Sequence, residues 1–157
     1  MGPARLAKMG LATLGFAGLA AGAAFSQDVS GGSAALDRFR WPLRGAILKD
    51  FKEGESDGIE IAAPTGEPVH AAADGVCIYA GDELKTYGKL VLIRHADGFI
   101  TAYADLSELA VKEGDKVRRG QIIAKAGQSG DAASPRLHFE LRKDGKPVDP
   151  IRYLAPL

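Results

Sequence analysis

The chain has 157 residues, of which 46% are hydrophobic and 25% charged, and this is enough for one domain with an apolar core. Its 20 basic and 20 acidic side chains balance, and they are interspersed along the chain. The sequence lacks the basic stripe of a protein that follows a phosphate backbone, so we expect no nucleic-acid partner.

Residues 1–26 have the three parts of a secretory signal peptide. Arg5 and Lys8 form the basic start, residues 9–25 form an apolar run rich in Gly and Ala, and Ala24-Phe25-Ser26 places small residues before the expected cleavage point. The run is short and weakly apolar for a membrane-spanning helix. We therefore expect a periplasmic or secreted protein. The alternative is an uncleaved signal that anchors the chain to the inner membrane with its domain facing the periplasm.

Residues 27–38 are rich in Ser, Gly and Ala and are expected to form a linker. From residue 39 to residue 157, short strand-like stretches alternate with turn signals such as Asp97-Gly98. The clearest predicted hairpin joins Leu90–His95 to Phe99–Tyr103 across this turn. The pattern predicts one all-β domain, a small antiparallel barrel or sandwich, with strands at Ile59–Ala62, Gly75–Tyr79, Leu90–Arg94, Phe99–Tyr103, Gln121–Lys125 and Leu137–Arg142.

The single cysteine, Cys77, cannot form an internal disulfide, and its strand-like surroundings predict a buried small hydrophobe. Residues 114–127 are similar to a phrase found in biotinyl and lipoyl carrier domains, which need a lysine at the tip of a tight hairpin. Lys85 is the nearest candidate, but it lacks the flanking residues of such carriers. An exported chain also leaves the cytoplasm, where attachment occurs, so a carrier module is a minor alternative.

Nine phrases of the sequence resemble, in order, those of the LytM or lysostaphin-like zinc endopeptidases. They are residues 58–69, 71–76, 87–88, 91–95, 101–107, 117–121, 127–130, 137–141 and 148–150. Each phrase alone is weak, but their common order from about Trp41 to Leu154 is specific. The resemblance implies a LytM-type β domain, of the duplicated hybrid motif kind, for residues 39–157.

Active members of that family hold zinc with a His and an Asp four residues apart and with the second His of a His-x-His pair, and two further histidines assist. Three protein ligands leave an open position where zinc acidifies the attacking water. Here Ser56, Glu60 and His138 stand at the ligand positions, while Asp105 and Arg136 replace the assisting histidines. The resemblance therefore implies a dismantled site, with no catalytic residues, no bound metal and no cofactor.

Arg136 is expected on the same strand face as His138, because residues two apart on a strand point the same way. Its permanent guanidinium charge would then lie where the cation sits in an active enzyme. We therefore hypothesise that Arg136 replaces the metal's charge and pairs with Glu60, Asp105 or both. His70 and His95 lie outside the ligand phrases and are expected to be structural or surface residues.

Degenerate LytM proteins of the EnvC and NlpD type activate periplasmic cell-wall amidases during cell separation. By resemblance, we expect a non-catalytic factor that binds and activates such an amidase, or another peptidoglycan hydrolase, with peptidoglycan as a further candidate partner. The former active site is expected to line or support the partner-binding groove, through Ser56, Glu60, Asp105, Arg136 and His138. The alternatives are a peptidoglycan-binding or structural envelope module and, less favoured, a residual metalloendopeptidase that acts on peptidoglycan cross-links.

Overall fold

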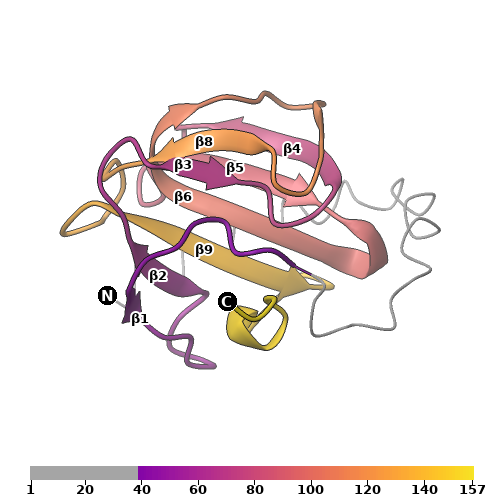
Figure 1. The fold of residues 1–157 in the computed structure, drawn as a ribbon, viewed down its shortest axis with the longest axis horizontal. Helices are drawn as coiled ribbons and strands as arrows, with labels where there is room; N and C mark the ends of the chain where they lie inside the picture. The colour runs from indigo at the N-terminus through magenta and orange to yellow at the C-terminus, as the bar shows by residue number, and fades with distance from the viewer. Residues whose placement is uncertain (1–38) are drawn as a thin grey trace.

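The computed structural model describes residues 39–157; the expected signal peptide and linker lie outside the described residues. The described chain is almost entirely antiparallel β structure with two single-turn 3-10 helices, η3 (Ala96–Gly98) and η4 (Pro150–Arg152) (Figure 1). Within these residues no helix is long and apolar enough to cross a bilayer. The strands are β1 (Ile47–Lys49), β2 (Ile59–Ala62), β3 (Pro68–His70), β4 (Gly75–Gly81), β5 (Lys89–Arg94), β6 (Phe99–Leu109), β7 (Lys116–Val117), β8 (Ile122–Ala126), β9 (Arg136–Lys143) and β10 (Lys146–Val148).

The strands form one sheet that folds over itself. Its main path runs β1-β2-β9-β6-β5-β4-β7, and β10 pairs with β9 beside β2. The long strand β6 pairs with β5 and β9 over its first part, while its end pairs with β8, which in turn pairs with β3. Figure 1 shows β3 and β8 lying over one face of the sheet. The all-β antiparallel prediction is confirmed, and the sheet has the open edges of a folded sandwich because β1 and β7 end its path.

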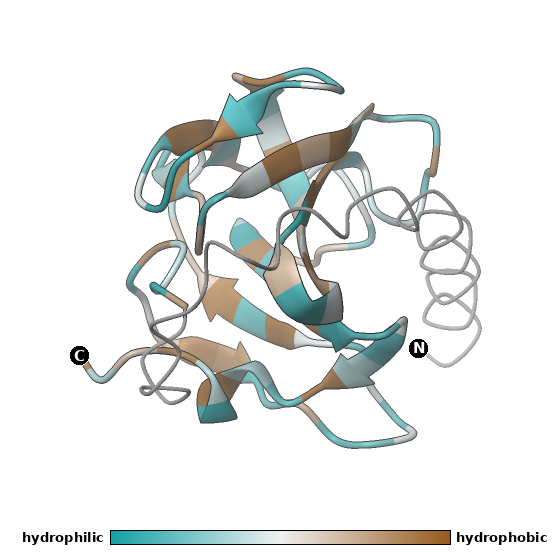
Figure 2. Cartoon of the chain, turned by 90° about the vertical axis from the view of Figure 1, so that its right-hand side faces the viewer, coloured by the Kyte–Doolittle hydropathy of each residue, from teal (hydrophilic) through white to brown (hydrophobic). Residues whose placement is uncertain are grey.

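Apolar and polar side chains alternate along the strands, and the apolar ones form the core between these layers. In β9, Leu137, Phe139 and Leu141 are at most 1% exposed and join the core that Val69 and Ile123 close from β3 and β8. Burying each such side chain stabilises the fold by about 1.5–3 kcal/mol. The opposite face of β9 carries polar side chains, so apolar and polar residues alternate along the strands in Figure 2.

The predicted hairpin is confirmed as β5 and β6, joined through Asp97 and Gly98, both of which adopt positive φ. The prediction for β2 matches the strand, whereas β6 continues to Leu109, well beyond the expected end. The sequence did not predict β1, β3, β7 and β10, which have only two or three residues each.

Two side chains expected to be structural are placed as predicted. Cys77 is fully buried in the core, and this burial raises the pKa of its thiol to about 11. His95 is 5% exposed, with Nδ1 2.7 Å from the Asp74 carbonyl oxygen and Nε2 2.8 Å from Thr101 Oγ1. Both therefore serve the packing of the domain.

Candidate functional site

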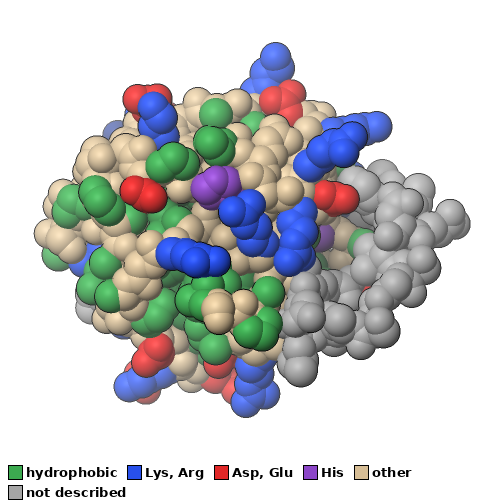
Figure 3. Space-filling view, in the orientation of Figure 1, with side chains coloured by type: hydrophobic (Ala, Val, Ile, Leu, Met, Phe, Trp, Pro, Cys, Tyr) green, Lys and Arg blue, Asp and Glu red, His purple; other side chains and the backbone are tan. Residues whose placement is uncertain are grey.

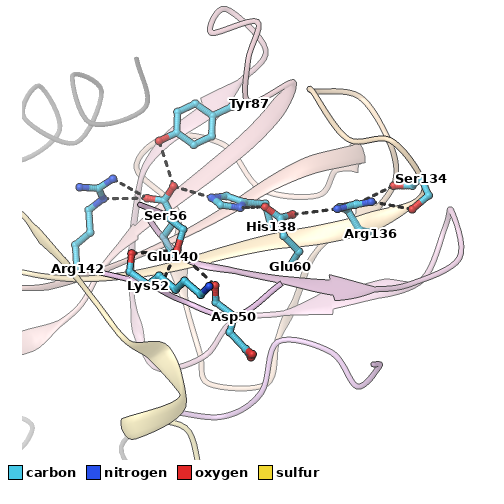
Figure 4. A network of polar contacts seen from close by, with 10 residues as sticks. All are labelled: Asp50, Lys52, Ser56, Glu60, Tyr87, Ser134, Arg136, His138, Glu140 and Arg142. Atoms are coloured by element: carbon cyan, nitrogen blue, oxygen red, sulfur yellow. Dashed lines mark hydrogen bonds and ion pairs between the residues drawn. The ribbon is translucent and has the colours of Figure 1, made fainter. Parts of the chain in front are cut away.

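A network of buried polar side chains lies along the face of β9 that points away from the apolar core. Strands β2 and β9 pair with Glu60 opposite His138. The His138 ring is clamped between two carboxylates, with Nδ1 2.7 Å from Glu60 Oε2 and Nε2 2.8 Å from Glu140 Oε2 (Figure 4). All three residues are at most 3% exposed. His138, which the family resemblance places at a ligand position, is therefore held by hydrogen bonds on both ring nitrogens.

A buried arginine forms one end of this network of polar side chains. Arg142 donates from Nε to Glu140 Oε1 at 2.9 Å, and its Nη2 lies at the same distance from that oxygen. The Tyr87 hydroxyl donates to the other Glu140 oxygen at 3.3 Å. Glu140 thus meets a guanidinium, a phenol and the imidazole, which together satisfy a carboxylate that is 1% exposed.

Electrostatics keep both of these donors protonated. Burial raises the pKa of the Tyr87 hydroxyl above its ordinary value, and the nearby Glu140 carboxylate raises it further. Burial opposes the charge of Arg142, but Glu140, Tyr87 and Asp57 together outweigh it, and the guanidinium pKa lies above its ordinary value. Arg142 and Tyr87 therefore remain donors to Glu140 at neutral pH.

At its other end, the network of polar side chains reaches the surface through Arg136. Its Nη1 lies 4.0 Å from Glu60 Oε1, while Nε and Nη2 donate to the backbone and side-chain oxygens of Ser134 at 3.1 and 2.9 Å. The Arg136 side chain is 18% exposed, unlike Glu60 at 3%. The hypothesised pair with Glu60 is present as a long contact, and Ser134 fixes the guanidinium more closely.

Ser56 follows the turn before β2, and Asp105 lies at an irregularity within strand β6. The Ser56 hydroxyl accepts the Lys52 backbone N–H at 2.8 Å and so closes the turn before β2. Asp105 adopts φ 63° at an irregularity in β6, and its N–H donates to the Tyr87 carbonyl oxygen at 2.9 Å. Its Oδ1 packs so close to Gly130 that a Cβ there would lie 2.3 Å away. The structure thus brings Glu60, Arg136 and His138 into one network. Ser56 and Asp105 lie outside this network, in neighbouring segments.

Sequence reasoning missed Tyr87, Glu140 and Arg142. For two of them a signal exists: polar residues at every second position from Arg136 to Arg142 predict one polar strand face, and Glu140 and Arg142 continue the series of His138. Tyr87 carries no such signal, because it comes from the loop before β5 and meets Glu140 only in the folded chain.

The residues at the former ligand positions do not fit zinc. Two atoms bound to one tetrahedral zinc at about 2.0–2.1 Å would lie about 3.3 Å apart. His138 Nδ1 and Glu60 Oε2 are 2.7 Å apart, which is a hydrogen bond with no room for an ion between them. Nε2 of the same ring is committed to Glu140, and the Ser56 hydroxyl is committed to the Lys52 backbone. Across residues 39–157, no group of three or more His, Cys, Asp or Glu side chains has a metal-holding arrangement.

The fold and the position of this network define the class of protein. Residues 54–150 match the model of Peptidase family M23, and the chain belongs to this family. It is similar to a zinc-containing peptidase of Vibrio cholerae, with a TM-score of 0.68 and 30% identity over 78% of this chain and 41% of that one. The expected LytM resemblance is confirmed, and the carrier-module alternative falls away.

Two relatives lie closer in sequence. The murein hydrolase activator NlpD of Salmonella dublin is 44% identical over 124 residues, which cover 78% of this chain and 33% of NlpD. The cell division protein DipM of Caulobacter vibrioides is 46% identical over 127 residues, which cover 74% of this chain and 21% of DipM. The chain thus spans a third or less of the length of these two relatives.

Proposed function

We propose that this chain is a non-catalytic regulator of peptidoglycan remodelling that binds and activates a cell-wall amidase during division. The observation that carries the proposal is the 2.7 Å contact between Glu60 and His138, which leaves no room for an ion between these two side chains. The relatives NlpD, a murein hydrolase activator, and DipM, a cell division protein, support the choice of process. An exported location, with the domain in the periplasm, completes the proposal.

The proposed contact surface is the rim of the buried network. Four of the five residues assigned to the groove, Ser56, Glu60, Asp105 and His138, are at most 7% exposed, so they support the surface from beneath. Arg136 reaches the surface. The exposed loops of residues 52–55 and 128–134 border the network, as Figure 4 shows for its two sides. A segment of the amidase would lie between these loops and meet the Arg136 guanidinium, a common anchor in protein interfaces.

Rigidity explains how a buried polar network serves this role. The side-chain polar atoms of Glu140 and His138 all have partners, supplied by β2, by β9 itself and by Tyr87, so the network would hold one geometry without a metal. A pre-organised surface lowers the ordering cost of binding a partner segment. The former catalytic centre would thus become a scaffold for the loops above it.

The test is a paired assay with the purified chain and a cell-wall amidase from the same organism. We expect substoichiometric zinc, no release of dye from labelled peptidoglycan by the chain alone, and several-fold faster release when chain and amidase are combined. Arg136→Ala should lower the stimulation, while Lys146→Ala, an exposed change on β10, should leave it intact. Digestion by the chain alone that disappears in His138→Ala would establish the residual peptidase instead.

A peptidoglycan-binding module is the second candidate function. One observation favours it: a cavity lined by arginines and a tryptophan lies apart from the buried network and shares no residue with it. Sedimentation of the chain with insoluble peptidoglycan, in the absence of amidase, tests this candidate separately.

A further inference from the structure

A cavity of about 390 Å³ lies outside the former active site. This volume is within the range of small-molecule sites, roughly 300–1,000 Å³. It is formed by the segment before β1, by β3 and by the end of the described chain. Its lining includes Arg40, Trp41, Arg44, Glu67 and His70.

The cavity and the buried network lie on opposite faces of the sheet. Leu43, which lines the cavity, packs into the core together with Leu137, whereas His138 points to the other face of β9. Figure 3 looks onto the cavity side, where Lys and Arg side chains gather beside a histidine and apolar side chains. A ligand here would leave the rim of the Glu60–His138 network open to a protein partner.

Several lining groups are held in place by the fold. The Trp41 indole N–H donates to the Ala155 carbonyl oxygen at 2.7 Å. The Arg40 guanidinium rests on Gly120, where an added Cβ would lie 2.4 Å from its Nη1. His70 Nδ1 donates to the Pro42 carbonyl oxygen at 3.3 Å, which orients the ring. Arg40 and Arg44 are both exposed and lack ion-pair partners among residues 39–157.

These groups favour a particular ligand chemistry. Two guanidinium groups at one cavity bind carboxylates through paired N–H donors. The half-buried Trp41 ring offers an apolar surface of the kind on which a sugar ring packs. The Glu67 carboxylate adds an acceptor for hydroxyl, amide or amine donors, and the His70 ring adds a further polar group. The combination suits a sugar that carries a peptide with free carboxylates.

We propose that this cavity binds an uncrosslinked peptidoglycan fragment, a disaccharide with its stem peptide, through Arg40, Arg44 and Trp41. The choice of ligand rests on the proposed envelope function, while the site itself rests on the cavity and its lining. Such binding would hold the regulator on the substrate of the amidase that it activates.

The test is titration of the full chain with a soluble disaccharide-tetrapeptide, followed by the fluorescence of Trp41, the single tryptophan. We expect saturable binding that weakens about tenfold or more in R40Q/R44Q, because the variant loses both charged donors to the ligand carboxylates. The control variant K112Q/K146Q removes the same charge at exposed positions outside the cavity and should bind like the wild type. A neutral chitin tetrasaccharide should bind at least tenfold more weakly than the muropeptide.

Absence of muropeptide binding, equal binding by R40Q/R44Q, or equal binding of the neutral glycan would each overturn the assignment. Amidase stimulation is measured in parallel with the same proteins. Stimulation without muropeptide binding would leave the proposed function standing and remove the cavity site. Muropeptide binding that depends on Arg40 and Arg44, without stimulation, would do the reverse.

Discussion

Substitution of Glu140 by Gln should destabilise the domain strongly. The change keeps the side-chain shape but removes the negative charge that faces Arg142 at 2.9 Å, and Arg142 is only 3% exposed. Breaking a buried ion pair from one side leaves an uncompensated charge and costs about 3–5 kcal/mol. For a domain of this size, that loss lowers Tm by about 12–20 °C, and it is a large part of a total stability of about 5–15 kcal/mol.

The assay is urea unfolding followed by Trp41 fluorescence and by circular dichroism. Glu108→Gln is the matched control, because Glu108 pairs with Lys125 at 3.6 Å on the surface, with both side chains about half exposed or more. This control should cost less than about 1 kcal/mol. The double variant E140Q/R142M removes the stranded cation and should recover at least half of the loss. If the free energies of unfolding of E140Q and E108Q differ by less than about 1 kcal/mol, the buried ion pair does not contribute the expected stability.

Three further predictions test the site and its walls. Arg136→Ala should cost less than about 1 kcal/mol of stability, because its Glu60 contact is 4.0 Å long and partly exposed, yet should reduce amidase stimulation about tenfold. Cys77, with a pKa of about 11, should have only about one thiolate in a thousand at pH 8, so a thiol reagent should label it slowly until denaturant is added. Because its folded pKa is raised from 9.0, its contribution to stability should be complete below pH 9 and lost between pH 9 and 11; a thiol that titrates near pH 9 in the native state would contradict this. Gly130→Ala should cost about 1–3 kcal/mol in urea unfolding, because the new Cβ would lie 2.3 Å from Asp105 Oδ1 and 2.7 Å from the Thr86 carbonyl oxygen; a neutral change would show that this loop moves freely.

The sequence predicts the long strands of this fold because they carry a strong local signal. β2 and β9 alternate apolar and polar residues, and the β5–β6 hairpin has Asp97-Gly98 at its turn. The short strands β3 and β7 carry no comparable pattern, because their two or three residues become strands only by pairing with β8 and β4. Local chemistry therefore predicted the framework, and tertiary pairing supplied the rest.

The candidate site was predicted as a set of positions and not as a network. Family motifs locate Glu60 and His138, and strand periodicity places Arg136 on their face. The hypothesis that Arg136 replaces the metal's charge gives that residue a central place, whereas the structure holds His138 mainly through Glu60 and Glu140. Whether Arg136 lies near Glu60 or Asp105 depends on the irregularity at Asp105, where a positive φ redirects the side chain toward Gly130. A backbone feature of that kind has no signature in motif spacing.

Loss of a zinc ligand alone would leave a costly defect in a buried centre. A histidine that is 1% exposed needs partners for both ring nitrogens, and a vacated ligand position would leave Nδ1 unsatisfied at a cost of about 1–3 kcal/mol. Glu60 removes this defect, because its chain is one methylene longer than the aspartate of active enzymes and reaches Nδ1 at 2.7 Å. The residue that the family resemblance places at a ligand position is thus also the one that supplies the missing partner of His138. A centre whose polar groups are satisfied by its own side chains needs no metal to hold its geometry, and the proposed role as a scaffold for partner binding requires this.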